Sequence, residues 1–179
     1  MILDTISQYF GVEISVILAP VSMLLSTAVG STVAIITVRS HRKNARLKNS
    51  MDFINSYNED TDIGKAIKEI NELKKKPSSD IEKMATSDGS CENTMHIRIV
   101  LNYYEAIAIC IGHKIYDETI IKETVYTTVL DMWSICLPYV KERRKQDGKE
   151  TYYQEMALLT ERWIKKPLKK KNGKRFFFF

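Results

Sequence analysis

The order of apolar and polar positions separates an uncharged N-terminal stretch from a series of shorter helical patterns. Residues 14–38 form a run of 25 residues without a charged side chain. As an α-helix rising ~1.5 Å per residue, this run would be about 37 Å long, which exceeds the ~30 Å hydrocarbon core of a bilayer. A cleaved signal peptide would need a positively charged start and a shorter apolar core, and neither is present. The pattern therefore predicts a transmembrane helix over residues 14–38, behind a short N-terminus at residues 1–13.

Residues 39–76 are expected to form a basic juxtamembrane and helical segment. Its first part, residues 45–57, would continue the membrane helix, with apolar side chains on one side at Leu47, Met51 and Ile54. Thr61 is placed to cap a second helix, whose apolar positions at helical spacing are Ile63, Ala66, Ile67, Ile70 and Leu73. Small and polar side chains then dominate residues 77–91, which predicts a loop with one short turn around residues 81–84.

Residues 92–164 carry three further amphipathic patterns and are expected to form the core of a helical bundle. The first helix would end at Gly112, and its apolar stripe is Ile97, Val100, Leu101, Tyr104, Ile107, Ala108 and Ile111. The second would begin after a cap at Asp117 and be broken or kinked by Pro138, and its inner face holds Ile121, Val125, Val129, Met132 and Cys136. The third would open with a capping box at Thr151 and Gln154, and its apolar side holds Tyr152, Met156, Leu159 and Trp163.

These patterns together predict the fold class. No segment alternates apolar and polar residues over any length, and the chain has only 7 Gly and 4 Pro among its 179 residues. Both observations favour helices over a turn-rich β architecture. We therefore expect an all-α protein with one N-terminal transmembrane helix and a small cytoplasmic helical bundle.

Charge changes this picture by giving the chain an orientation. The net charge of +5 comes from two basic clusters, one of five cations at residues 39–48 and one of seven at residues 165–175. Because the first cluster directly follows the apolar run, the positive-inside rule places the C-terminal side in the cytoplasm and residues 1–13 outside. The expected location is the inner (plasma) membrane, crossed once. Since the cations form two local clusters rather than covering one domain face, nucleic acid is not an expected partner.

Small residues recur every four positions along the apolar run, at Ser22, Ser26, Gly30 and Ala34. This spacing places them on one helix face, where the backbones of two helices can approach closely. The stripe suggests pairing with a second copy of the chain or with another membrane protein. The alternative is that Ser, Gly and Ala are simply common in such spans.

Residues 165–179 form a basic tail that ends in phenylalanines, and its membrane-associating residues would be Lys169, Lys170, Lys171, Phe176, Phe177, Phe178 and Phe179. Cations near an anionic leaflet contribute about 1 kcal/mol each, and phenylalanine rings can insert at the interface. We expect the tail to contact anionic lipids. The alternatives are a disordered solubilising tail and stacking on single-stranded nucleic acid.

The stretch LNYYEAIAICIGHKIYDETIIKE, residues 101–123, resembles a bacterial and phage family called domain of unknown function 4760. The resemblance extends over residues 40–164 and rests on Asn102, Tyr103, Glu105, Gly112, Tyr116, Asp117, Trp133, Pro138, Arg162 and Trp163. It implies a helical domain behind a membrane anchor and brings no assigned activity. It also suggests a phage-exclusion or phage-defence setting for a protein that acts by binding other proteins.

Acidic side chains near the first bundle helix are the best candidates for chemistry. Glu105 and Asp117, with Asn102 and Glu118 nearby, could line an acidic pocket for general acid–base work on a small or nucleotide substrate. The competing hypothesis, which we prefer, is structural: Asn102 and Glu105 would form polar links to a neighbouring helix, for instance to Arg98 or Arg162. Two tryptophans, Trp133 and Trp163, are expected to serve as structural core residues.

No cofactor or metal is expected. Cys110 and His113 are two soft ligands without the third or fourth that zinc needs. The three cysteines, Cys91, Cys110 and Cys136, are too few and too widely spaced for a disulfide framework, and the latter two fit apolar helix faces. The leading hypothesis is a membrane-anchored, non-enzymatic interaction protein, and the alternative is a membrane-tethered enzyme that uses Glu105 and Asp117.

Overall fold

The computed structural model describes residues 14–56, 61–86 and 92–169, with side chains from residue 20 onward. These residues form six α-helices and no β-strand, which confirms the all-α prediction. The chain divides into two compact units, Met1–Ala45 and Arg46–Phe179, and we call the second unit the body.

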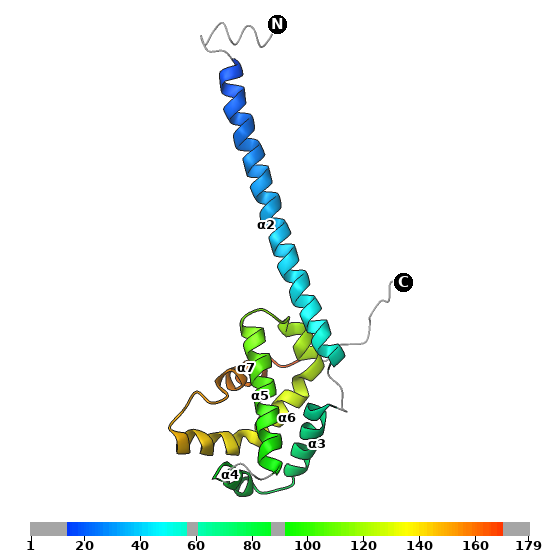
Figure 1. The fold of residues 1–179 in the computed structure, drawn as a ribbon, viewed down its shortest axis with the longest axis vertical. Helices are drawn as coiled ribbons and strands as arrows, with labels where there is room; N and C mark the ends of the chain where they lie inside the picture. The colour runs from blue at the N-terminus through cyan, green and yellow to red at the C-terminus, as the bar shows by residue number, and fades with distance from the viewer. Residues whose placement is uncertain (1–13, 57–60, 87–91, 170–179) are drawn as a thin grey trace, which may run out of the picture. The chain divides into compact units, whose positions relative to one another are not determined.

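The first helix described, α2, covers Ile14–Ser56 without interruption (Figure 1). Its part from Pro20 to Ser56 is long and apolar enough to cross a membrane. Side chains in the apolar part are open to the surroundings: Met23 and Leu24, for example, are 70% and 71% exposed. The prediction that the helix continues past the apolar run is therefore confirmed.

The body contains five further helices: α3 (Asp62–Leu73), α4 (Ser78–Thr86), α5 (Glu92–Gly112), α6 (Glu118–Asp147) and α7 (Gln154–Lys165). Helix α5 contacts each of the other four and so forms the centre of the bundle, with α3 and α7 on different sides of it in Figure 1. All seven residues of its predicted apolar stripe are buried, as are all five predicted inner residues of α6. Burial of these stripes is what drives the helices together.

Helix α4 corrects the loop predicted for residues 77–91. Residues 78–86 form a helix that packs on α6, and the side chains of Ile81 and Ala85 are 4% and 1% exposed. Pro77 precedes this helix, where its fixed φ and missing N–H are tolerated. The remainder of the predicted loop, residues 87–91, lies outside the described residues.

The last turns of α2 belong to the body, and their inner face agrees in part with the predicted one, since Leu47 and Ile54 are half-buried. Ser50 and Phe53 are buried, whereas Met51, which was expected on the inner side, is 49% exposed. The Phe53 ring lies 5.7 Å from that of Tyr116, and the hydroxyl of Ser50 accepts a 2.7 Å hydrogen bond from the backbone N–H of Asp117. These contacts attach the end of α2 to the segment between α5 and α6.

The two helix interruptions predicted at Pro138 and Gly112 are both found, with one difference in detail. Pro138 lies inside α6, which continues to Asp147 but changes direction toward its C-terminal end in Figure 1, so the helix is kinked rather than broken. Gly112 is the last residue of α5, as predicted, but the left-handed residue that turns the chain is Lys114, with φ 58°.

Candidate functional site

Glu105, the first candidate for catalysis, caps the N-terminus of another helix. Its carboxylate accepts hydrogen bonds from the backbone N–H groups of Glu155 (3.1 Å) and Met156 (2.7 Å), in the first turn of α7. The residue preceding α7, Tyr153, is left-handed and makes no side-chain capping bond. The capping box predicted at Thr151 and Gln154 is therefore wrong, because a carboxylate from α5 satisfies these N–H groups instead.

Asp117 and Glu118 are engaged in separate interactions. The Asp117 carboxylate accepts bonds from the N–H groups of Thr119 and Ile120, which confirms it as the cap of α6. Glu118 instead accepts bonds from Arg162 Nε (3.0 Å) and Trp163 Nε1 (2.9 Å). Glu105, Asp117 and Glu118, which were expected to line one pocket, are thus engaged in three separate sets of hydrogen bonds. Within the described residues, no group of three side chains that could hold a metal ion occurs.

The interhelical link predicted for Glu105 exists, but with partners other than the expected arginines. Arg162 pairs with Glu118 rather than with Glu105. Asn102 lies exposed on α5, so it is not one of the buried links between helices. Trp163 is fully buried, and Trp133 is half-buried against the core.

The two described cysteines sit in apolar surroundings. Cys136 is buried on α6, and burial raises the pKa of its thiol to about 12. Cys110 is half-buried on α5, and burial raises the pKa of its thiol as well. Because only thiolates are good nucleophiles, both residues act as small packing groups.

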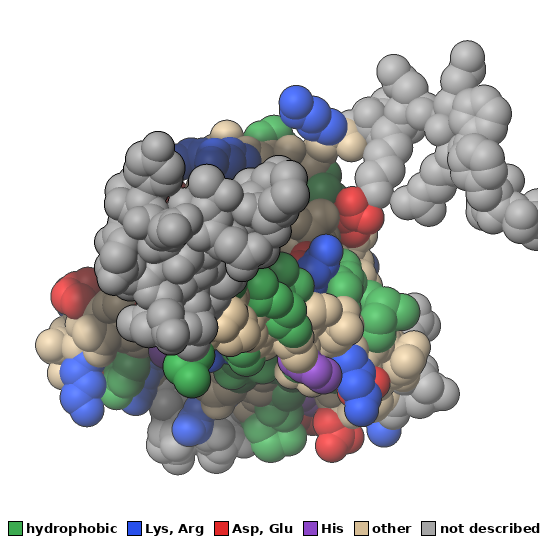
Figure 2. Space-filling model, turned by 90° about the horizontal axis from the view of Figure 1, so that it is seen from above, with side chains coloured by type: hydrophobic (Ala, Val, Ile, Leu, Met, Phe, Trp, Pro, Cys, Tyr) green, Lys and Arg blue, Asp and Glu red, His purple; other side chains and the backbone are tan. Residues whose placement is uncertain are grey.

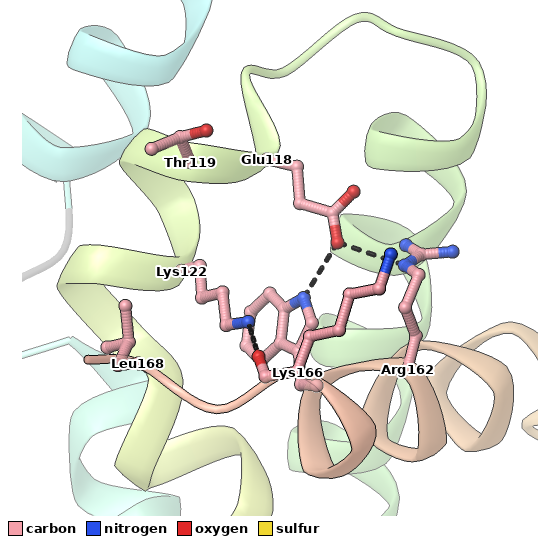
Figure 3. Close-up of a pocket in the computed structure, with 7 residues that line it drawn as sticks. Glu118, Thr119, Lys122, Arg162, Lys166 and Leu168 are labelled. Atoms are coloured by element: carbon pink, nitrogen blue, oxygen red, sulfur yellow. Dashed lines mark hydrogen bonds and ion pairs between the residues drawn. The ribbon is translucent and has the colours of Figure 1, made fainter.

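A pocket with a volume of about 300 Å³ lies where α6 begins and α7 ends, and we call it the basic pocket. Figure 3 shows Glu118, Thr119 and Lys122 reaching it from α6, while Arg162 and Lys166 approach from the end of α7. Trp163 and Leu168 complete its lining. The charge of this lining is unbalanced, since three cations face a single carboxylate.

Lys122 is held in place at one wall of the basic pocket. Its ammonium donates a short hydrogen bond to the backbone carbonyl of Lys166. It also lies 5.4 Å from the centre of the Tyr126 ring and 5.8 Å from that of Trp163. Cation–π attraction to these rings keeps the charge at the wall without neutralising it.

The remaining predicted site residues fall into two groups. The small residues of α2, Ser22, Ser26, Gly30 and Ala34, are exposed, and a Cβ added to Gly30 would meet no atom within 4 Å. Lys169 is exposed beyond the end of α7. The other predicted tail residues lie outside the described residues: Lys170, Lys171, Phe176, Phe177, Phe178 and Phe179.

The family model described as Domain of unknown function (DUF4760) matches residues 24–163. The chain belongs to this family. The matched region of this DUF4760 protein starts within the apolar part of α2 and ends at Trp163, so it includes most of α2 and most of the body. No curated protein and no solved structure matches the chain.

Sequence reasoning missed the basic pocket of this DUF4760 protein. Its residues come from two places more than forty positions apart, as the separation of 44 between Glu118 and Arg162 shows. The available signal was the cluster of cations around Trp163, of which we assigned Lys165 and Lys166 to the tail and Arg162 to a link with Asn102 or Glu105. The sequence alone does not show that the end of α7 packs against the first turns of α6.

Proposed function

We propose that this DUF4760 protein is a single-pass membrane protein whose body works by binding rather than by catalysis. One observation carries the proposal: α2 presents an apolar stretch that no described part of the chain covers, with large side chains such as Met23 and Leu25 being 70% and 61% exposed. A soluble monomer rarely leaves so long an apolar surface in water. A bilayer would cover it.

The proposed orientation is N-terminus outside and body in the cytoplasm, at the inner membrane. It is supported by the five cations of residues 39–48, which directly follow the apolar run. Moving these cations across the bilayer would be costly, so the side that carries them stays inside.

A topology measurement on the full chain tests the orientation. Replacing Arg39, Arg42 and Lys43 with glutamine should reduce the fraction of chains with a cytoplasmic C-terminus, read from a reporter fused to that end. The matched control is glutamine at Lys74, Lys75 and Lys76, which removes equal charge far from the span and should leave topology unchanged. A reporter that remains outside in the unaltered chain, or a body released from membranes by alkaline carbonate, would refute the proposal.

Binding is favoured over catalysis because the strongest catalytic candidates have structural duties. The carboxylates of Glu105 and Asp117 accept hydrogen bonds from backbone N–H groups at the N-termini of α7 and α6, respectively. No contact among the described residues favours an enzyme that uses these two carboxylates. Charges of both signs are interspersed with hydrophobic side chains on the face shown in Figure 2, which does not resemble a nucleic-acid footprint. The partners that we propose are anionic lipids at the basic tail and a second membrane helix at the small-residue stripe.

The helix-pairing part of this proposal has a matched test. Ala34→Leu places a large side chain in the small-residue stripe, whereas Ala28→Leu makes the same change outside it. We expect Ala34→Leu alone to reduce crosslinking between chains, or between the chain and a membrane partner, in intact membranes. Equal crosslinking in both variants would remove the stripe from the proposal. A phage-exclusion or phage-defence setting stays a prediction from the family resemblance.

A further inference from the structure

The basic pocket holds more positive charge than its own residues neutralise. Glu118 is the only carboxylate among the described residues of its lining, and it is already paired with the Nε atom of Arg162. Among the described residues neither Lys122 nor Lys166 forms an ion pair with a carboxylate. The described contacts of the Lys122 ammonium are neutral groups, the Lys166 carbonyl and two aromatic rings, so both positive charges remain uncompensated by a described acid. Figure 3 shows the side chains of Arg162 and Lys166 extending toward the same region beside Glu118.

The chemistry of these groups indicates the kind of ligand. Arg162 contributes only its Nε to Glu118, so its two terminal nitrogens remain available as a fork of donors. A fork of this kind together with two point-charge ammonium groups matches the several oxygens of a phosphate group better than it matches a single carboxylate. Thr119 adds a neutral polar residue to the lining.

Size and surroundings agree with a small anionic group. A volume of about 300 Å³ lies at the lower end of ligand pockets. Trp163 and Leu168 give the pocket an apolar side, which suits the carbon atoms attached to a phosphate. Lys169, the last described residue, directly follows Leu168 of the lining and adds positive charge beside the pocket.

We propose that the basic pocket binds a phosphate group, carried either by the headgroup of an anionic lipid or by a soluble phosphate compound. Lys122, Arg162 and Lys166 would bind its oxygens, while Glu118 orients Arg162 and keeps the indole N–H of Trp163 satisfied. The lipid form of this inference deepens the proposed function and rests on it, whereas the soluble form does not.

Thermal unfolding of the full chain in neutral detergent micelles tests the pocket, because a ligand that binds only the folded state raises the Tm. Three probes are compared at constant ionic strength: inorganic phosphate, phosphatidic acid mixed into the micelles, and phosphatidylcholine as the zwitterionic control, whose phosphate is already paired with its own choline cation. The key variant is Lys166→Gln, whose side chain is exposed and should not disturb folding. Its matched control is Lys65→Gln, which removes the same charge from an exposed position of α3, outside both the lining and the basic tail. Lys122→Gln, with Lys141→Gln as its control on α6, repeats the comparison at the opposite wall.

We expect phosphate or phosphatidic acid to raise the Tm in a saturable way, and phosphatidylcholine to have no effect. In Lys166→Gln and Lys122→Gln, about ten times more probe should be needed for the same rise, because each variant loses one charge-assisted contact. A response to phosphatidic acid alone assigns the lipid source, and a response to phosphate alone assigns the soluble one. The proposal is overturned if neither probe raises the Tm, or if the control variants weaken the response equally. Because the phosphate measurement needs no bilayer, its failure is separate from any failure of the membrane topology.

Discussion

Replacing Glu105 with alanine would remove the carboxylate that caps α7. Two backbone N–H groups would lose their acceptor. The shorter of the two hydrogen bonds, at 2.7 Å, comes from Met156, which is fully buried. Hydrogen bonds to a charged group contribute roughly 1.5–3 kcal/mol each, and the loss of an N-cap costs about 0.5–2 kcal/mol. Because the two bonds share one half-buried carboxylate and are not additive, we expect a loss of about 2 kcal/mol in unfolding free energy.

The assay is thermal unfolding of the full chain in neutral detergent, followed by far-ultraviolet circular dichroism. For a body of this size, the expected loss corresponds to a fall in Tm of roughly 5–8 °C. Glu105→Gln keeps one acceptor oxygen but not the charge, so we expect about half the effect. Asn102→Ala, at an exposed position of the same helix, is the control and should change the free energy by less than about 0.5 kcal/mol.

The capping role of Glu105 is refuted if the Tm of Glu105→Ala equals that of the unaltered chain within experimental error. It also fails if Asn102→Ala is equally destabilising, since the cost would then belong to α5 in general rather than to the cap. A loss confined to Glu105 would leave the enzyme hypothesis without its best residue, because the carboxylate would be needed for folding itself.

Three other predictions concern the thiols and the end of α2. Cys136 should resist alkylation at pH 8 in the folded chain and react fully after unfolding, whereas half-buried Cys110 should react at an intermediate rate, as peptide mass spectrometry would show. The folded thiol of Cys136 has a pKa of about 12 against an ordinary 9.0, so the unfolded chain binds fewer protons between these values. Unfolding free energy should therefore fall as pH rises from 9 toward 12, by about 2–3 kcal/mol at pH 11 for this group, and Cys136→Ala should flatten that fall in denaturant titrations. Ser50→Ala should cost about 1–2 kcal/mol in the same titrations, because it removes the acceptor for the N–H of Asp117, whereas Ser56→Ala at the exposed end of α2 should cost less than half as much.

Periodicity was a sufficient guide to the long helices of the body. The apolar stripes of α5 and α6 could be identified in advance because burial, which the 3.6-residue repeat reports directly, decides those positions. The same reasoning located the cap of α6 at Asp117, since that contact is made within four residues.

Contacts between distant segments account for what the sequence did not predict. Helix α4 has only nine residues and two buried side chains, too few to give a periodic signal. The cap of α7 comes from Glu105, fifty positions away, while the local sequence offered a plausible but wrong capping box. The basic pocket has the same origin, because Lys122 and Lys166 are brought together only by the packing of α7 on α6.

The cap donated by α5 also bears on the order in which the body folds. Helix α7 has twelve residues, close to the limit below which an isolated helix is marginal in water, and its N-terminal N–H groups are satisfied from a helix made much earlier. During synthesis α5 leaves the ribosome first, so its carboxylate is in place before α7 exists. Helix α7 then docks last. Its contacts join residues far apart in the sequence, so the entropy of the intervening loop is lost before those contacts form. Arg162 and Lys166 reach their positions only at that step, so anion binding would appear only in chains that have finished folding.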